Sequence, residues 1–134
     1  VDIEGVALSR QGEICLIQMC GSSSETPTVY LFDVHVLGAE AFEAGGLKTL
    51  LEAEWVTKVF FDVRGDNDAL HHQFGVDVRG AYDAQVLWHL RFQHPEDPYL
   101  QGLKRVQDLF LEESGALTPR SAADLRGVKE AGQR

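Results

Sequence analysis

The chain has 134 residues, of which 44% are hydrophobic and 25% are charged. These proportions are ordinary for a folded protein, so they exclude disordered and fibrous classes and predict one soluble globular domain over residues 1–134. The formal net charge of −9 argues against general, sequence-independent affinity for nucleic acid, which is carried largely by Lys and Arg. An acidic protein can still bind phosphate where its carboxylates hold divalent cations.

No apolar run approaches the roughly 20 residues that span a bilayer, so we expect no membrane partner. The two cysteines, Cys15 and Cys20, lie an odd number of positions apart in one predicted strand. Regular alternation would then place them on opposite faces, as reduced and buried thiols. We expect no histidine within reach of either, and we expect an intracellular protein, in the cytoplasm or the nucleus.

Three apolar, β-branched segments open the chain, at residues 1–8, 14–20 and 29–32. The short polar connections between them predict an antiparallel meander of three strands. The pattern then changes to alternation of helix and strand. A helix is predicted over 47–53, with Leu47, Leu50 and Leu51 on one face, and a strand over 58–61.

The alternation continues to residue 110. A helix is predicted over 62–74 with Gly75 as its C-cap, followed by a short extended piece at 76–78. Asp83 is expected to cap a helix over 84–92, another helix is expected over 103–110, and a weak one near 122–128. This order predicts an α/β fold of RNase H-like architecture. Its mixed sheet would have three antiparallel strands, then parallel strand-helix units, and helices on both faces.

Two acids stand in the first predicted strand. Asp2 and Glu4 are two positions apart, so they project from one face with Cα atoms roughly 6.5 Å apart, given ~3.3 Å per residue. If they point inward they need partners or cations, because burying an unpaired charge is costly. The alternative is that both lie on a solvated edge of the sheet.

A second group of acids crowds a strand-to-helix junction. Asp62, Asp66 and Asp68 follow the apolar strand over 58–61. Acids at the start of a helix are also ordinary caps and partners of the helix dipole. We therefore expect one metal ligand and two structural acids among the three.

The second group has neighbours that are typical of a known family. The sequence Lys-Val-Phe-Phe-Asp at 58–62 is followed by Arg64, Asp66, Phe74-Gly75 and Tyr-Asp-Ala-Gln-Val at 82–86. This order resembles the second motif of RNase D-like (DEDD) 3′-to-5′ exonuclease domains, most closely the Egalitarian-like branch. Asp2-Ile3-Glu4 resembles the first motif, and the resemblance extends from residue 1 to about residue 111.

The resemblance implies a metal-dependent 3′-to-5′ exonuclease that acts on single-stranded or 3′-end nucleic acid by two-metal phosphodiester hydrolysis. Asp2 and Glu4 would be the metal ligands of the first motif and Asp66 that of the second, with Asp68 as the alternative. Asp83 matches an acid that is structural in the family. The implied cofactor is Mg²⁺ or Mn²⁺, and the implied partner is the 3′ end of RNA or DNA, with protein partners left open.

The third motif of the family is a Tyr or His four residues before a final Asp. This chain has no match to it, since Arg120 stands four residues before Asp124. We therefore expect the domain to be incomplete at both ends. The alternative function is a catalytically inactive module with an exonuclease fold that binds RNA or protein partners.

Overall fold

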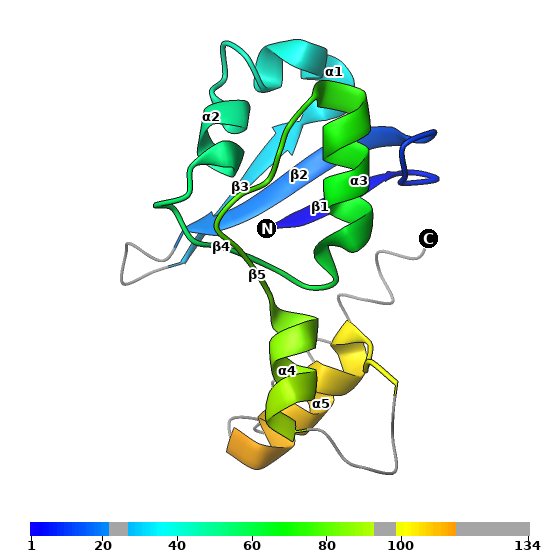
Figure 1. Ribbon diagram of the computed structural model, residues 1–134, viewed down its shortest axis with the longest axis vertical. Helices are drawn as coiled ribbons and strands as arrows, with labels where there is room; N and C mark the ends of the chain where they lie inside the picture. Colours follow the sequence, from blue (N-terminus) through cyan, green and yellow to red (C-terminus); the bar gives the residue numbers. More distant parts are fainter. Residues whose placement is uncertain (22–26, 93–98, 115–134) are drawn as a thin grey trace. The chain divides into compact units, whose positions relative to one another are not determined.

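A computed structural model of the chain describes residues 1–21, 27–92 and 99–114 (Figure 1). The chain divides into two compact units, Val1–Phe92 and Gln93–Arg134, and each is described by itself. The weak helix expected near 122–128 lies outside the described residues. The single domain over residues 1–134 stays a prediction.

The predicted meander is confirmed. Strands β1 (Asp2–Val6), β2 (Glu13–Gly21) and β3 (Thr28–Asp33) form an antiparallel sheet in the order β1-β2-β3. Ile3 pairs with Ile17, which pairs with Phe32, so one face of the sheet presents apolar side chains to the core.

A β-bulge interrupts the pairing of β1 with β2. Glu4 pairs with Leu16, but the next residue, Gly5, pairs with Ile14. Cys15 is therefore an extra residue on β2, with no residue of β1 opposite it.

The bulge decides which side chains of β2 reach the core. Ile14 and Ile17 are both fully buried, although regular alternation would place residues three apart on opposite faces. The extra residue at the bulge, Cys15, shifts the alternation by one position, so that Ile14 and Ile17 face the same side of the sheet. Gly5 permits the close approach of the two strands, because a Cβ at this position would lie 2.1 Å from the carbonyl oxygen of Glu13.

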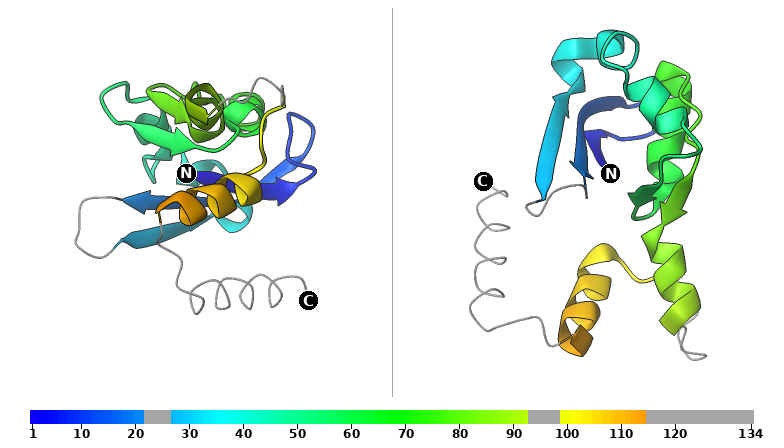
Figure 2. Two further views of the ribbon diagram at one scale, coloured as in Figure 1. Left: turned by 90° about the horizontal axis from the view of Figure 1, so that it is seen from below. Right: turned by 90° about the vertical axis from the view of Figure 1, so that its left-hand side faces the viewer.

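A layer of helices lies against the sheet. The elements after β3 are α1 (Val34–Leu37), η1 (Gly38–Ala41), α2 (Leu47–Glu52), β4 (Lys58–Phe60), α3 (Val63–Phe74), β5 (Ala81–Asp83) and α4 (Ala84–Phe92). Both views in Figure 2 show α2 and α3 beside the same face of the β1-β2-β3 sheet. The largest fully buried side chains of this unit are Ile14, Ile17, Leu51, Phe60, Leu70 and Val76.

The parallel part of the fold is formed by β4 and β5. The amino group of Val1 donates to the carbonyl oxygen of Val59 at 2.7 Å, so β1 and β4 begin side by side. The predicted mixed arrangement of antiparallel and parallel strands is thereby confirmed, as are the helices after β4 and β5. Gly75 ends α3 in the left-handed conformation, with φ 61°, as predicted for a C-cap.

Several details differ from the sequence predictions. The extended piece expected at 76–78 is not part of a strand, because the next strand is β5, over Ala81–Asp83; Val76 is buried by packing and not by strand pairing. Leu50 is 38% exposed, so it lies outside the apolar face of α2. The two cysteines are free, with Cys15 half-buried and Cys20 exposed, so the prediction of two buried thiols is wrong.

The short helices α1 and η1 were not predicted. A single turn has no periodic pattern to detect, but its start carries a signal, because the Asp33 side chain accepts the Val36 N–H at 3.0 Å. In the second unit the described residues include one helix, α5, Leu103–Ser114. Within the described ranges, no helix is both long and apolar enough to cross a membrane.

Replacing Gly5 with alanine should lower the free energy of unfolding by roughly 1 to 3 kcal/mol, because the methyl group would overlap the backbone of β2. Urea unfolding followed by circular dichroism measures the change. Gly21→Ala, at the other end of β2, is the matched control, since its nearest neighbour would be a ring carbon of Tyr30 at 4.0 Å. Equal unfolding midpoints for the two variants would contradict the role assigned to Gly5.

Candidate metal-binding acids

The two acids of β1 lie on the face of the sheet that points away from the core. Ile3, between them, is buried, whereas Asp2 and Glu4 are exposed. Gln18, opposite Asp2 on β2, donates its amide N–H to Asp2 Oδ2 at 3.4 Å. Both acids share one face, as predicted, and of the two placements left open by the sequence the structure shows the solvated one.

Asp66 is the buried acid of the group. It lies in the first turn of α3 and is 9% exposed. Burial raises the pKa of this carboxyl to about 6, and repulsion by Asp2, Asp62 and, less strongly, Glu4 adds to the rise. The positive amino group of Val1 acts in the opposite direction. Asp66 is thus near enough to the acids of β1 for their charges to act on it.

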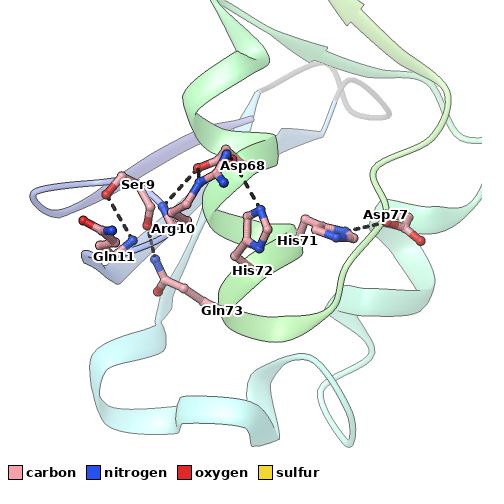
Figure 3. Close-up of polar contacts among 8 residues, drawn as sticks. All are labelled: Ser9, Arg10, Gln11, Asp68, His71, His72, Gln73 and Asp77. Carbon is pink, nitrogen blue, oxygen red and sulfur yellow. Dashed lines mark hydrogen bonds and ion pairs between the residues drawn. The ribbon is translucent and has the colours of Figure 1, made fainter.

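The other acids at the β4–α3 junction have partners of their own. Arg64 donates to both carboxylate oxygens of Asp62, at 2.6 and 2.9 Å, and lowers its pKa. Arg10 reaches Asp68 at 2.7 Å and lowers the pKa of that group as well. Figure 3 shows Asp68 between Arg10, from the β1–β2 hairpin, and His72. The carboxylate of Asp68, the alternative ligand, is therefore paired with the guanidinium group of Arg10.

Asp83 holds the junction in shape, consistent with the structural role implied for it. Its carboxylate accepts the backbone N–H groups of Asp62 at 3.0 Å, Val63 at 3.1 Å and Gln85 at 2.9 Å. One side chain therefore caps the starts of both α3 and α4. Asp62 has a left-handed backbone, with φ 61°, which turns the chain sharply from β4 into α3 and places Asp66 one turn further on.

Asp66 differs from its neighbours because it has no such partner. Among the described residues, no Lys, Arg or His forms an ion pair with Asp2, Glu4 or Asp66. An acid that is buried, repelled by other acids and left unpaired fits a site for a divalent cation. The donors are carboxylate oxygens, which suit Mg²⁺ or Mn²⁺.

The three acids are not gathered tightly in the described structure. Within the described ranges, the side chains whose ligand atoms all lie within 4.8 Å of one another are Glu13, Cys15 and His35; Asp2, Glu4 and Asp66 do not form such a group. The Cys15 cluster was missed from the sequence, where no histidine was expected near either cysteine.

Comparison with known proteins points to one family. A sequence model described as 3′-5′ exonuclease matches residues 1–103. The piRNA biogenesis protein EXD1 of Mus musculus is 38% identical over 92 residues, which are 69% of this chain and 15% of that protein. The human EXD1 protein is 36% identical over 100 residues, 75% of this chain and 18% of that protein. The Egalitarian protein homolog of Caenorhabditis elegans is 33% identical over 94 residues, 70% of this chain and 16% of that protein.

Solved structures agree with this assignment. The structure of Trypanosoma brucei RNase D in complex with RNA U12 superposes with a TM-score of 0.68 and 31% identity, covering 93% of this chain and 42% of that one. The complex of the same enzyme with GMP gives a TM-score of 0.69 at 29% identity, covering 92% and 39%.

The fold, with carboxylates on its first strand and at the start of the helix after β4, defines an α/β domain of the nuclease class. The chain belongs to the 3′-5′ exonuclease family and is an RNase D-like domain. It spans 15 to 18% of the length of the EXD1 proteins of mouse and human.

Replacing Asp66 with asparagine should stabilise the metal-free protein at pH 7, by at most about 3 kcal/mol. The folded state raises the pKa of Asp66 from 3.8 to about 6, so ionisation above pH 6 opposes folding. The gain should shrink as the pH falls through 6 and vanish near pH 4. Urea unfolding across this pH range measures it.

Asp68→Asn is the matched control and should act in the opposite direction. Arg10 lowers the pKa of Asp68, so the ionised form stabilises the fold at pH 7, and the variant should lose that contribution. If Asp66→Asn destabilised the metal-free protein at pH 7, the burial of an unpaired charge at this position would be contradicted.

Proposed function

We propose that this chain carries the metal-binding part of a 3′-to-5′ exonuclease that hydrolyses single-stranded or 3′-end nucleic acid. The single observation that supports it most is Asp66, in a member of an exonuclease family: among the described residues this buried carboxylate has no Lys, Arg or His partner, and the charges of Asp2 and Glu4 act on it. The RNase D neighbours with bound RNA and GMP support nucleic acid as the substrate class.

Asp2, Glu4 and Asp66 would hold Mg²⁺ or Mn²⁺. Bound divalent cations supply acidity to water and neutralise charge on the phosphate and on the leaving oxygen. In the proposed reaction a water oxygen attacks the terminal phosphorus and the bond from phosphorus to the 3′ oxygen breaks. That oxygen takes up a proton, and a nucleoside 5′-monophosphate is released.

Each side chain of the proposed site would have a role that follows from its position. Asp2 and Glu4 present their carboxylates on the exposed face of β1, where a phosphate group can approach them. Gln18 donates to Asp2 Oδ2 and so orients that carboxylate toward its ligand position. Asp66 contributes from α3, whose start is fixed by the carboxylate of Asp83.

Titration calorimetry with Mn²⁺ tests the metal site in this chain. Wild type should bind Mn²⁺, and the Asp2→Ala, Asp66→Ala double variant should bind at least about 100-fold more weakly. Asp68→Ala is the control and should bind as wild type does, because Asp68 is engaged by Arg10. The same affinity in the double variant and in wild type would rule out the proposed ligands.

Acid should weaken this binding. Asp66 has a pKa of about 6, so protons compete with the cation below that pH, and affinity should fall between pH 7 and pH 5. The Asp68→Ala variant should show the same fall, since its change leaves Asp66 in place.

Activity is tested in the longest natural protein that contains this chain. With Mg²⁺ or Mn²⁺ it should shorten a 5′-labelled single-stranded oligonucleotide one nucleotide at a time from the 3′ end. Phosphorothioate linkages at the 3′ end should block the reaction, and Asp66→Asn should abolish it. Shortening that persists in Asp66→Asn would contradict the assignment.

The second candidate is an exonuclease-fold module that binds RNA or protein without cleaving it. The observation that favours it is the formal net charge of −9, which suits a module whose surface contacts protein. Oligonucleotide binding without shortening in either metal would support this candidate. The intracellular location stays a prediction.

A further inference from the structure

A group of three different metal-ligating side chains lies at the α1 end of β2. Glu13 and Cys15 come from β2, and His35 comes from α1. Their ligand atoms all lie within 4.8 Å of one another, and the His35 ring nitrogen Nδ1 is 2.7 Å from Glu13 Oε1. Among the described residues no other such group is found.

The fold places these residues together through two local features. Glu13 and Cys15 are two positions apart on β2, and the bulge leaves Cys15 as the residue with no partner on β1. On the other side, β3 pairs Asp33 with Leu16, the neighbour of Cys15, and Asp33 caps α1. His35, two residues after Asp33, is thereby held beside the start of β2.

The donor set has a definite chemical preference. It combines a thiolate, an imidazole and a carboxylate, which together suit Zn²⁺, whereas Mg²⁺ and Ca²⁺ prefer oxygen donors alone. In a tetrahedral zinc site with bonds of about 2.0 to 2.3 Å, neighbouring ligand atoms lie about 3.3 to 3.5 Å apart. Side chains whose ligand atoms already lie within 4.8 Å reach that spacing by small rotations.

We propose that Glu13, Cys15 and His35 form a Zn²⁺ site that is separate from the acids of the exonuclease site. Its three protein ligands leave a fourth position for water. The ion replaces the proton shared between His35 and Glu13 and draws Cys15, as a thiolate, into the same shell. The bound ion ties α1 to the start of β2, next to the strand that carries Asp2 and Glu4.

Cobalt is the probe for this site, because Co²⁺ occupies zinc sites and gives a thiolate-to-metal charge-transfer absorption when a cysteine is a ligand. Titration of the metal-free chain with Co²⁺ should produce this band, and Zn²⁺ should remove it. Cys15→Ser should abolish the band, and His35→Ala should weaken Co²⁺ binding by about 100-fold or more.

Matched controls are available in the same chain. Cys20→Ser should keep the band, because Cys20 is exposed and belongs to no such group. His71→Ala should also keep it, since His71 is an exposed histidine paired with a different acid, Asp77. The Asp2→Ala, Asp66→Ala double variant should keep it too, so failure of this site and failure of the exonuclease site are distinguishable.

A second measurement does not depend on cobalt. In Cys20→Ser the only cysteine is Cys15, and Zn²⁺ should slow its alkylation by iodoacetamide until a chelator is added. Absence of the charge-transfer band in wild type, its persistence in Cys15→Ser, its loss in Cys20→Ser, or alkylation unaffected by Zn²⁺ would each overturn the proposal.

Discussion

The junction between β4 and α3 depends on one carboxylate, that of Asp83. It accepts two N–H groups at the start of α3 and one at the start of α4, groups that a helix cannot satisfy internally. Because Asp83 ends β5, which is paired in parallel with β4, strand pairing and helix capping fix each other. The position of Asp66, one turn into α3, follows from that arrangement. Asp83, which has a structural role, thus determines where the buried acid Asp66 lies.

The acids of this domain differ in their effect on the stability of the fold. Asp62, Asp68 and Asp83 each lower the energy of the fold through arginine partners or backbone N–H groups. Asp66 does the reverse, because it is buried near other negative charges. The cation proposed for this site would offset that cost, because it would pair with the Asp66 carboxylate. Asp2 and Glu4 are exposed, so their charges cost the fold little free energy. They matter here because they repel the charge of Asp66.

The parts of the fold that could be predicted from sequence are the strands and helix ends that a local residue pattern specifies. Apolar, β-branched segments joined by short polar connections predicted the meander, and Asp83 and Gly75 marked helix ends. The bulge at Cys15 could not be predicted, because one extra residue in a continuous apolar run leaves no local signal. The turn α1 was missed for a similar reason, and with it the approach of His35 to Cys15. The preference for Asp66 over Asp68 came from family resemblance alone; the pairing of Asp68 with Arg10 depends on contacts 58 positions apart.

Because of the bulge, β2 could lose one residue and still pair with β1. Pairing runs from Gly5–Ile14 directly to Glu4–Leu16, so a β2 strand lacking Cys15 would form a regular ladder with every other pair unchanged. Ile14 and Ile17 would still face the core, since their separation would then be even. Cys15 is therefore a residue whose deletion the sheet itself could accept, and the fold alone gives no reason for its presence.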